Sequence, residues 1–410
     1  MRVAIIGAGA GGAGCALGLL HGAARQGVDV TVTLFEPKSF GEHYNQCMGV
    51  LTPGQVERDL AEWGLEIPAE LIQRRVASYV LHAGASEIAL GGGPDMPDSC
   101  VTRRVHFDAF LEAKAQSKGA DVHGDRVTDI EFVRDEALIY TEGRTCRADF
   151  VVGAFGLDPG TAAILARRTA YRPPPAVGTL VRKIHFGEPA HVEGLLGDCI
   201  HAFVPRLRRV QFGALVPKGN HVSAIVAGRH IVAGDMETFL ELPEVASLLP
   251  PDRELSETYR GNFPAGVARG ISGRRHLVVG DASGFVRPLK GGGIHAALTT
   301  GRRAARALLE HGPSRQAGRS YERACAGLRR DIAYGRVFEW ALALLTGMLR
   351  MEPVIDLANR DSSLRHALFA CVSGSESYAL IARRLANVPL VARAVGALAT
   401  DLVRRPARRT

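Results

Sequence analysis

The chain has 410 residues, a length that favours two or three domains over one compact core. Its 46% hydrophobic and 22% charged residues exclude both a disordered chain and a membrane-embedded helical bundle. The formal net charge is +8, but only 6 of the 50 basic residues are lysine, an arginine bias that a GC-rich genome produces without a functional cause. The charge is therefore weak evidence for a nucleic-acid partner, and we expect none.

The cysteine pattern and one apolar stretch bear on location. Seven cysteines, an odd number without a C-x-x-C pair, argue against a disulfide framework and a zinc site. We therefore expect a cytoplasmic protein without a metal. The uncharged stretch 3–20 has the hydropathy of a signal peptide or membrane span, but a folded nucleotide-binding turn accounts for each of its six glycines.

The first predicted elements form a nucleotide-binding unit. A short apolar strand is predicted over 2–6, and an apolar helix follows to about residue 26. Between them stands G-x-G-x-x-G, formed by Gly7, Gly9 and Gly12. The first glycine permits a tight turn, the second lets the backbone approach a pyrophosphate, and the third lets helix pack on strand. The helix N-terminus offers free N–H groups and a positive dipole end to phosphates.

A second strand is predicted over 28–35, and it ends at Glu36, where an acid can bind a ribose hydroxyl pair. Strand, glycine motif, helix, strand and acid together favour a dinucleotide site. The alternative is a glycine-rich turn without a ligand.

A second nucleotide-facing element lies some 270 residues further along, where a strand over 276–279 leads into Gly-Asp and then a glycine run before a helix. Two such distant elements imply a long ligand, and FAD is long enough. The acid is placed for the ribityl chain, and the glycine turn aims a helix N-terminus at the isoalloxazine. The residues expected at this end of FAD are Gly280, Asp281, Gly291, Gly292, Gly293 and Ile294.

With these motifs, the R-x-x-F-D pattern over 104–108 and the segment 148–156, the chain resembles the geranylgeranyl reductase family of flavoproteins, which share the para-hydroxybenzoate hydroxylase fold. The resemblance covers most of the chain. It implies an α/β fold with a Rossmann-like FAD-binding domain, an antiparallel β-sheet substrate domain and a C-terminal helical region. It also implies that Arg104 reaches the FAD phosphates, for which bidentate pairing is suited. The alternative is a surface arginine opening a helix over 107–118.

The three parts are discontinuous in sequence. We assign 1–70, 97–160 and 270–312 to the FAD-binding domain, 71–96 and 161–269 to the substrate domain, and 313–410 to the helical region. Alternating apolar residues predict strands of the substrate sheet over 78–82, 181–186, 210–216 and 221–227.

Two features favour the reductases over related flavoproteins, and a third departs from the reductase pattern. Aromatic hydroxylases usually carry G-D-A-A-H and a later G-x-N, whereas Gly284 and His295 stand at the corresponding positions here. Halogenase-like relatives carry W-x-W-x-I-P, and neither Trp63 nor Trp340 lies in such a context. Phe155 replaces the aspartate of the family's G-A-D-G motif, which argues against nicotinamide use. The reductant stays open between NAD(P)H and a carrier protein such as ferredoxin or flavodoxin.

The predicted substrate pocket comes from the segment 212–219, which resembles the family's Y-G-W-x-F-P-K-G with smaller side chains. The resemblance implies a reshaped pocket for a largely apolar substrate, an isoprenoid or another unsaturated compound. The pocket residues that we predict are Phe212, Ala214, Val216 and Pro217.

Cys47 is the candidate catalytic residue. The family has a cysteine in a comparable P-x-x-C-x-x-G setting near the flavin, and the match here is partial, with Val50 in place of the glycine. A thiol could protonate a carbon after hydride arrives, and His43 and Tyr44 are the neighbouring donors. The alternative is a buried cysteine acting as a small hydrophobe.

The chain after residue 313 is predicted to be helical, with an apolar stripe that includes Ile332, Phe338, Leu342 and Leu345. This stripe forms core, lines a tunnel for a hydrophobic substrate, or rests on a membrane surface together with the basic end over 404–409. A solvated tail is the alternative for that end.

The leading hypothesis is an FAD enzyme in which reduced flavin gives hydride to a carbon–carbon double bond. Two alternatives are a flavin-dependent monooxygenase and a noncatalytic FAD-bearing or lipid-binding protein.

Overall fold

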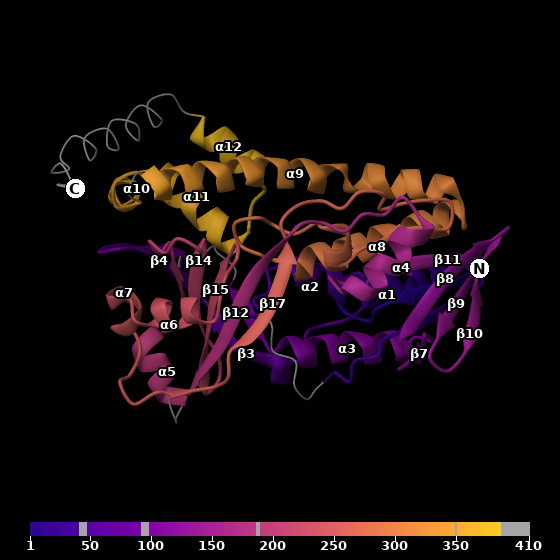
Figure 1. The fold of residues 1–410 in the computed structure, drawn as a ribbon, viewed down its shortest axis with the longest axis horizontal. Helices are drawn as coiled ribbons and strands as arrows, with labels where there is room; N and C mark the ends of the chain where they lie inside the picture. The colour runs from indigo at the N-terminus through magenta and orange to yellow at the C-terminus, as the bar shows by residue number, and fades with distance from the viewer. Residues whose placement is uncertain (41–46, 92–97, 186–188, 349–350, 387–410) are drawn as a thin grey trace.

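The computed structural model describes residues 1–40, 47–91, 98–185, 189–348 and 351–386. Figure 1 shows a parallel-sheet region and a large mixed sheet side by side, with long helices from the C-terminal part of the chain lying across both. His43, Tyr44 and the basic end over 404–409 lie outside the described part, as do the side chains of Leu342 and Leu345.

A five-stranded parallel sheet forms the centre of the first region. Its order is β18-β11-β1-β2-β7, with β1 at Arg2–Ile6, β2 at Thr31–Phe35, β7 at Asp121–His123, β11 at Phe150–Gly153 and β18 at His276–Val278. The strand predicted over 28–35 begins three residues later. Gly27 ends the preceding helix in the left-handed conformation, Val28 is 46% exposed, and pairing with β1 starts only at Thr31.

Helices α1 (Ala10–Gln26), α3 (Arg104–Ser117) and α8 (Ile294–His311) belong to this region. Small residues let α1 and α8 approach closely, since a Cβ added to Gly301 on α8 would lie 2.3 Å from the carbonyl oxygen of Gly11 on α1. This contact holds together two segments far apart in sequence, each of which begins at a glycine-rich turn. The two turns predicted from the sequence are therefore brought to one edge of the parallel sheet.

The substrate sheet has the path β16-β12-β15-β14-β13-β4-β5, with β17 also paired to β12. The strands are β4 Ser78–Ala83, β5 Ser86–Gly91, β12 Ala176–His185, β13 Cys199–Phe203, β14 Phe212–Pro217, β15 His221–Gly228, β16 Glu254–Leu255 and β17 Tyr259–Pro264. All pairs are antiparallel except β13 with β4, because β4 comes from the early insertion rather than from a hairpin.

The two faces of this sheet have different neighbours. Leu180, Leu215 and Val226 lie on one face and form a core with Met236 and Phe239, which belong to α6 (Gly234–Leu240). Helices α5 (Pro189–Leu196) and α7 (Pro243–Ala246) lie beside α6. Residues that alternate with these along each strand face the parallel-sheet region. The alternation predicted from the sequence thus separates core residues from residues that face the site.

The remaining elements complete the first region and the connections. They are α2 Gln55–Ala61, η1 Ala69–Leu71, β3 Ile72–Val76, β6 Ser99–Thr102, β8 Val127–Val133, β9 Glu136–Thr141, β10 Thr145–Ala148, α4 Pro159–Arg168 and η2 Gly280–Ser283. Strands β10, β9 and β8 form a separate three-stranded sheet, and β3 pairs with β6. Helix α4 crosses residue 160, the predicted limit of one FAD-domain segment.

The C-terminal region is helical, with α9 Arg315–Met348, α10 Glu352–Ala358, α11 Ser362–Ser373 and α12 Tyr378–Leu385. It is tied to the loop before α8, because the Arg287 guanidinium lies 4.2 Å from the ring centroid of Tyr378 and donates to the Glu376 carbonyl at 2.8 Å. Among the described helices, none is both long and apolar enough to cross a membrane.

Candidate active site

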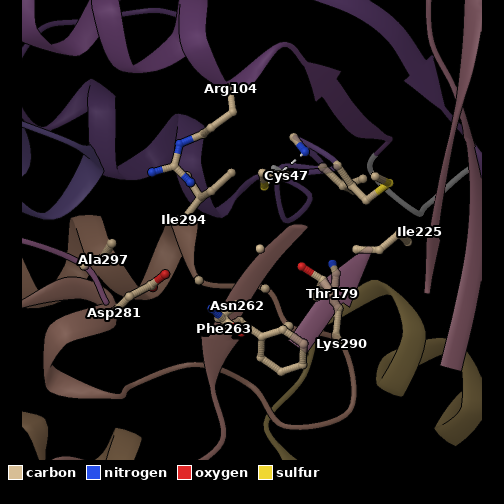
Figure 2. Close-up of a pocket in the computed structure, with 18 of the residues that line it drawn as sticks. Cys47, Arg104, Thr179, Ile225, Asn262, Phe263, Asp281, Lys290, Ile294 and Ala297 are labelled. Carbon is tan, nitrogen blue, oxygen red and sulfur yellow. Dashed lines mark hydrogen bonds between the residues drawn. The ribbon is translucent and has the colours of Figure 1, made fainter. Parts of the chain in front are cut away.

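A single cavity of about 800 Å³ joins the two glycine turns to the substrate sheet and the C-terminal helices. Figure 2 shows its middle, with Arg104 and Asp281 on opposite sides of the opening and Phe263 and Lys290 further along. The predicted site residues that line it are Gly7, Gly9, Glu36, Cys47, Arg104, Phe212, Ala214, Val216, Gly280, Asp281, Gly291, Gly292, Gly293 and Ile294. Gly12 and Pro217 lie outside its lining.

The first glycine turn requires glycine for steric reasons. Gly7 has φ +104°, and a Cβ there would lie 2.4 Å from the Ala154 carbonyl oxygen. A Cβ on Gly12 would lie 1.8 Å from the carbonyl oxygen of Gly7. Gly12 therefore shapes the turn through helix packing and does not face the cavity. Helix α1 begins after Gly9 without a side-chain cap from a described residue, which leaves its first N–H groups to a ligand.

Glu36 lies beside the first glycine turn. Its carboxylate accepts hydrogen bonds from the backbone N–H of Ala8 at 3.0 Å and of Lys38 at 3.1 Å. Burial raises the pKa of Glu36, and the two backbone donors oppose that shift. The carboxylate thus stands just after the end of β2, beside the glycine turn and at the wall of the cavity.

Arg104 lies beside the first glycine turn. Its Nε donates to the buried carboxylate of Asp108 at 2.7 Å, and its NH2 lies 3.8 Å from the point that a Cβ of Gly9 would occupy. Helix α3 begins at Arg104, earlier than the predicted 107, because Arg103 is the extended residue that precedes it. Arg104 is thus not a free surface arginine but a cation held beside the glycine turn.

Asp281 faces the cavity from the second turn, which leads into α8. Burial raises the pKa of Asp281, while the nearby Arg104 cation favours its ionised form. A Cβ on Gly293 would lie 2.8 Å from the Asp281 Oδ1, so a side chain there would have to displace this carboxylate. The two turns, the two acids and Arg104 form one continuous lining that fits an extended dinucleotide.

The apolar half of the cavity begins at the substrate sheet. Phe212, Ala214 and Val216 alternate along β14 and point to the cavity together with Ile225 on β15. Pro217 lies one position further along the strand, so the pleat turns it to the opposite face. Of the four predicted pocket residues, Phe212, Ala214 and Val216 line the cavity and Pro217 does not.

The C-terminal helices close the other side of this apolar half. Met351 and Val354 come from the α10 segment, and Leu364 and Leu368 from α11. Of the predicted stripe on α9, Ile332 is buried core, whereas Phe338 lines the cavity and contacts the ring of Tyr378. The helical region therefore supplies both core and cavity wall.

Cys47 lies where the cofactor half meets the apolar half. Its Sγ accepts the N–H of Gly49 at 3.3 Å. Gly49 has φ +67°, and a Cβ there would lie 2.0 Å from the Thr102 carbonyl oxygen, so this loop is fixed against β6. Electrostatic interactions link negative charge on Cys47 to Arg104 and Lys218. Figure 2 places Cys47 on the same side of the opening as Arg104.

Several cavity residues were not predicted from the sequence. Thr179 on β12 is 5% exposed and lines the cavity, as do Asn262 and Phe263 on β17. Lys290, directly before the glycine run, donates from Nζ to the Ser373 carbonyl, and burial lowers its pKa to about 7. The sequence signal that could have identified Lys290 as a cavity residue is its place as a lysine inside an apolar, glycine-rich segment. Its neighbours come from other elements, which the sequence pattern did not place.

Within the described residues, no group of three or more histidine, cysteine or acidic side chains could hold a metal ion. The fold and the cavity define the class: the chain has the α/β fold of FAD-dependent oxidoreductases, with a parallel sheet, a second sheet and C-terminal helices.

Solved structures share this fold over nearly the whole chain. A geranylgeranyl bacteriochlorophyll reductase-like protein from Thermoplasma acidophilum is 19% identical, with 97% of this chain and 98% of that chain covered and a TM-score of 0.72. A flavoprotein/dehydrogenase from Cytophaga hutchinsonii is 17% identical, with 98% and 100% covered and a TM-score of 0.73. A p-nitrophenol 4-monooxygenase from Pseudomonas putida is 16% identical, with 95% and 97% covered and a TM-score of 0.64.

Flavin-dependent halogenases are similar as well, and a flavin-dependent brominase reaches a TM-score of 0.66 at 15% identity, with 94% of this chain and 98% of that chain covered. No protein-family model matches the sequence, and no curated protein matches it either. The likeness is therefore one of fold, and the chemistry has to be argued from the residues of this chain.

Proposed function

We propose that the protein is an FAD-dependent reductase that adds two hydrogens across a carbon–carbon double bond of a largely apolar, isoprenoid-like substrate. The observation that carries this proposal is the single cavity, which runs from a dinucleotide-shaped lining directly into an apolar compartment walled by the sheet and by α10 and α11. A substrate with a long apolar part would be held there beside the flavin end of the cofactor.

Particular residues would hold FAD. Glu36 would bind the adenosine ribose, and Arg104 with the free N–H groups of α1 would bind the pyrophosphate. Asp281 would accept from the ribityl hydroxyls, and the N-terminus of α8 after Gly293 would stabilise negative charge on the reduced ring. When bound and reduced, FAD supplies the hydride.

The remaining step requires a proton, since hydride added to one carbon leaves negative charge on its neighbour. Cys47, which lines the cavity between its two halves, would donate this proton from Sγ. After the proton has moved to the second carbon, Arg104 and Lys218 stabilise the negative sulfur. Hydride and proton together give a saturated product, and the proton on Cys47 is restored from solvent.

The test is an anaerobic single-turnover experiment. Reduced FAD-loaded protein is mixed with polyprenyl or other unsaturated apolar substrates. Flavin absorbance follows the reoxidation of the cofactor, and mass spectrometry gives the molecular mass of the product. We expect a product two mass units heavier for each flavin reoxidised. Cys47→Ala should keep FAD and still be reduced, but substrate-dependent reoxidation should slow by about 10²- to 10⁴-fold, as for loss of a general acid.

The outcomes separate the roles of Cys47. If the residue only packs, Cys47→Ala should reoxidise as fast as the wild-type protein. Cys199→Ala is a matched control, since Cys199 begins β13 and its Sγ lies 2.8 Å from the Ser78 hydroxyl. Equal rates for all three proteins would end the catalytic role of Cys47.

A flavin-dependent monooxygenase is the second candidate, because a monooxygenase and a brominase share the fold at similar TM-scores. Incorporation of labelled oxygen into product, coupled to reductant consumption, would favour this candidate over the reductase. A protein that binds FAD without any turnover would exclude both.

A further inference from the structure

A band of basic side chains continues the substrate sheet beyond its apolar wall. On β12, Lys183 and His185 lie on the same face as Thr179, since the three alternate along one strand. The register pairs His185 with His221 on β15, and their rings lie 5.4 Å apart. The face that is apolar at the cavity therefore becomes basic at the ends of the strands.

Lys218 extends this band to the next strand. It follows β14, and its Nζ donates to the Thr102 carbonyl at 3.0 Å, which places the ammonium group against the residue that precedes Arg103. Lys218 is 1% exposed and His221 is 6% exposed. These two side chains form a buried floor, and the half-buried Arg103, Lys183 and His185 surround it.

The charges of this band are not balanced. In the described part of the chain, no carboxylate forms an ion pair with Arg103, Lys183 or Lys218, and the buried Nε of Arg103 has no hydrogen-bond partner. Burial lowers the pKa of His221 to about 3, and the charges of Lys218, Lys183, His185 and Arg103 act in the same direction. Unbalanced cations brought together from four segments favour a bound anion.

We propose that Arg103, Lys183 and Lys218, with His221 beneath them, form a binding site for a phosphoryl group of a small molecule. The site lies outside the cavity lining but next to it, because Lys218 and Arg104, the neighbour of Arg103, both act on Cys47. Arginine and lysine donors suit phosphate oxygens. The phosphate could belong to a pyridine nucleotide that approaches the flavin or to the head of an amphiphilic substrate whose chain enters the apolar compartment.

The test measures binding and does not depend on the proposed reduction. Inorganic pyrophosphate is titrated calorimetrically into FAD-loaded protein, so that the cofactor's own phosphate position is filled. Lys183→Gln and Arg103→Gln should each weaken binding by about tenfold to a hundredfold, as loss of a charge-assisted hydrogen bond implies. Lys118→Gln removes the same charge at the exposed far end of α3 and should leave the dissociation constant unchanged.

The flavin content of each purified variant reports whether it is folded. If Arg103→Gln loses FAD, because Arg103 is next to Arg104, Lys183→Gln on β12 still tests the proposal. Pyrophosphate binding with equal affinity to wild-type protein and Lys183→Gln, or no binding to the wild-type protein, would overturn the proposal. NADP⁺ and decyl phosphate are then titrated in parallel to distinguish the two sources. The compound that displaces pyrophosphate from the wild-type protein and binds more weakly to Lys183→Gln identifies the class of molecule that supplies the phosphate.

Discussion

Glu36 is the residue whose substitution most directly tests the dinucleotide site. In Glu36→Gln the side chain keeps its length, but the negative charge is lost and one oxygen becomes an NH2 group. The carboxylate accepts backbone N–H groups from Ala8 at 3.0 Å and Lys38 at 3.1 Å, so an amide can satisfy only one of the two donors and turns its own donor toward the other. The substitution therefore disturbs the glycine turn as well as the ribose contact.

The magnitude follows from the number of bonds. A hydrogen bond to a charged group contributes about 1.5 to 3 kcal/mol, and each 1.4 kcal/mol is a factor of ten in a dissociation constant. Loss of the ribose contact should thus weaken FAD binding by about ten- to a hundredfold. The lost backbone bond should lower the free energy of unfolding of the FAD-free protein by about 1 to 3 kcal/mol.

Two assays separate these effects. Quenching of flavin fluorescence gives the FAD dissociation constant, and denaturant unfolding of the FAD-free protein gives the stability change. Glu66→Gln is the matched control, since Glu66 is an exposed glutamate away from the cavity lining. If Glu36→Gln bound FAD as tightly as the wild-type protein, Glu36 would have no part in the cofactor site.

Three further predictions concern electron supply, packing and pH. NADPH should reduce the flavin more slowly than a low-potential protein or dithionite in stopped-flow absorbance, because Phe155 lines the cavity where the family has an aspartate; rapid, saturable bleaching by NADPH would contradict this. In denaturant unfolding, Gly301→Ala should lower the free energy of unfolding by about 1 to 3 kcal/mol, because its Cβ would lie 2.3 Å from the Gly11 carbonyl oxygen. Gly327→Ala is the control on α9, where a Cβ would have nothing within 4 Å, and it should raise the free energy of unfolding by up to about 1 kcal/mol. Burial, and then the neighbouring His201, lower the pKa of His82 from 6.5 to about 4. Between these two pH values the unfolded chain binds a proton at His82 that the folded protein does not bind. The free energy of unfolding should therefore fall by on the order of 3 kcal/mol as the pH drops from 6.5 towards 4. Unfolding curves at several pH values should show a smaller loss for His82→Phe, and identical slopes would contradict the assignment.

The local features of the cofactor site could be predicted from the sequence because they depend on neighbours in the chain. A strand, a turn with φ +104° at Gly7 and a helix that begins without a side-chain cap follow from a few consecutive residues. Glu36 could be predicted for the same reason, because it directly follows the second strand of this strand–turn–helix–strand unit. For this reason the glycines and Glu36 lie at the cavity, and only Gly12, which packs against the Gly7 carbonyl, turns away from it.

Strand limits and side-chain faces depended on partners elsewhere in the fold. The strand predicted over 28–35 begins at Thr31, where its pairing with Arg2 of β1 starts, and Pro217 lies outside the cavity lining because the pleat turns it to the opposite face. Both outcomes follow from register, which one segment of sequence cannot fix.

What the sequence by itself determined is the glycine-rich turn between β1 and α1 and the acid that follows β2, since short-range sterics dictate them. Only the tertiary structure decided that this turn opens into an apolar compartment, that Cys47 lies at the junction, and that Arg103, Lys183 and Lys218 form one basic band. These groups come from segments separated by dozens of residues. Sheet register and helix packing bring them together, and neither is encoded in the spacing of residues along the chain.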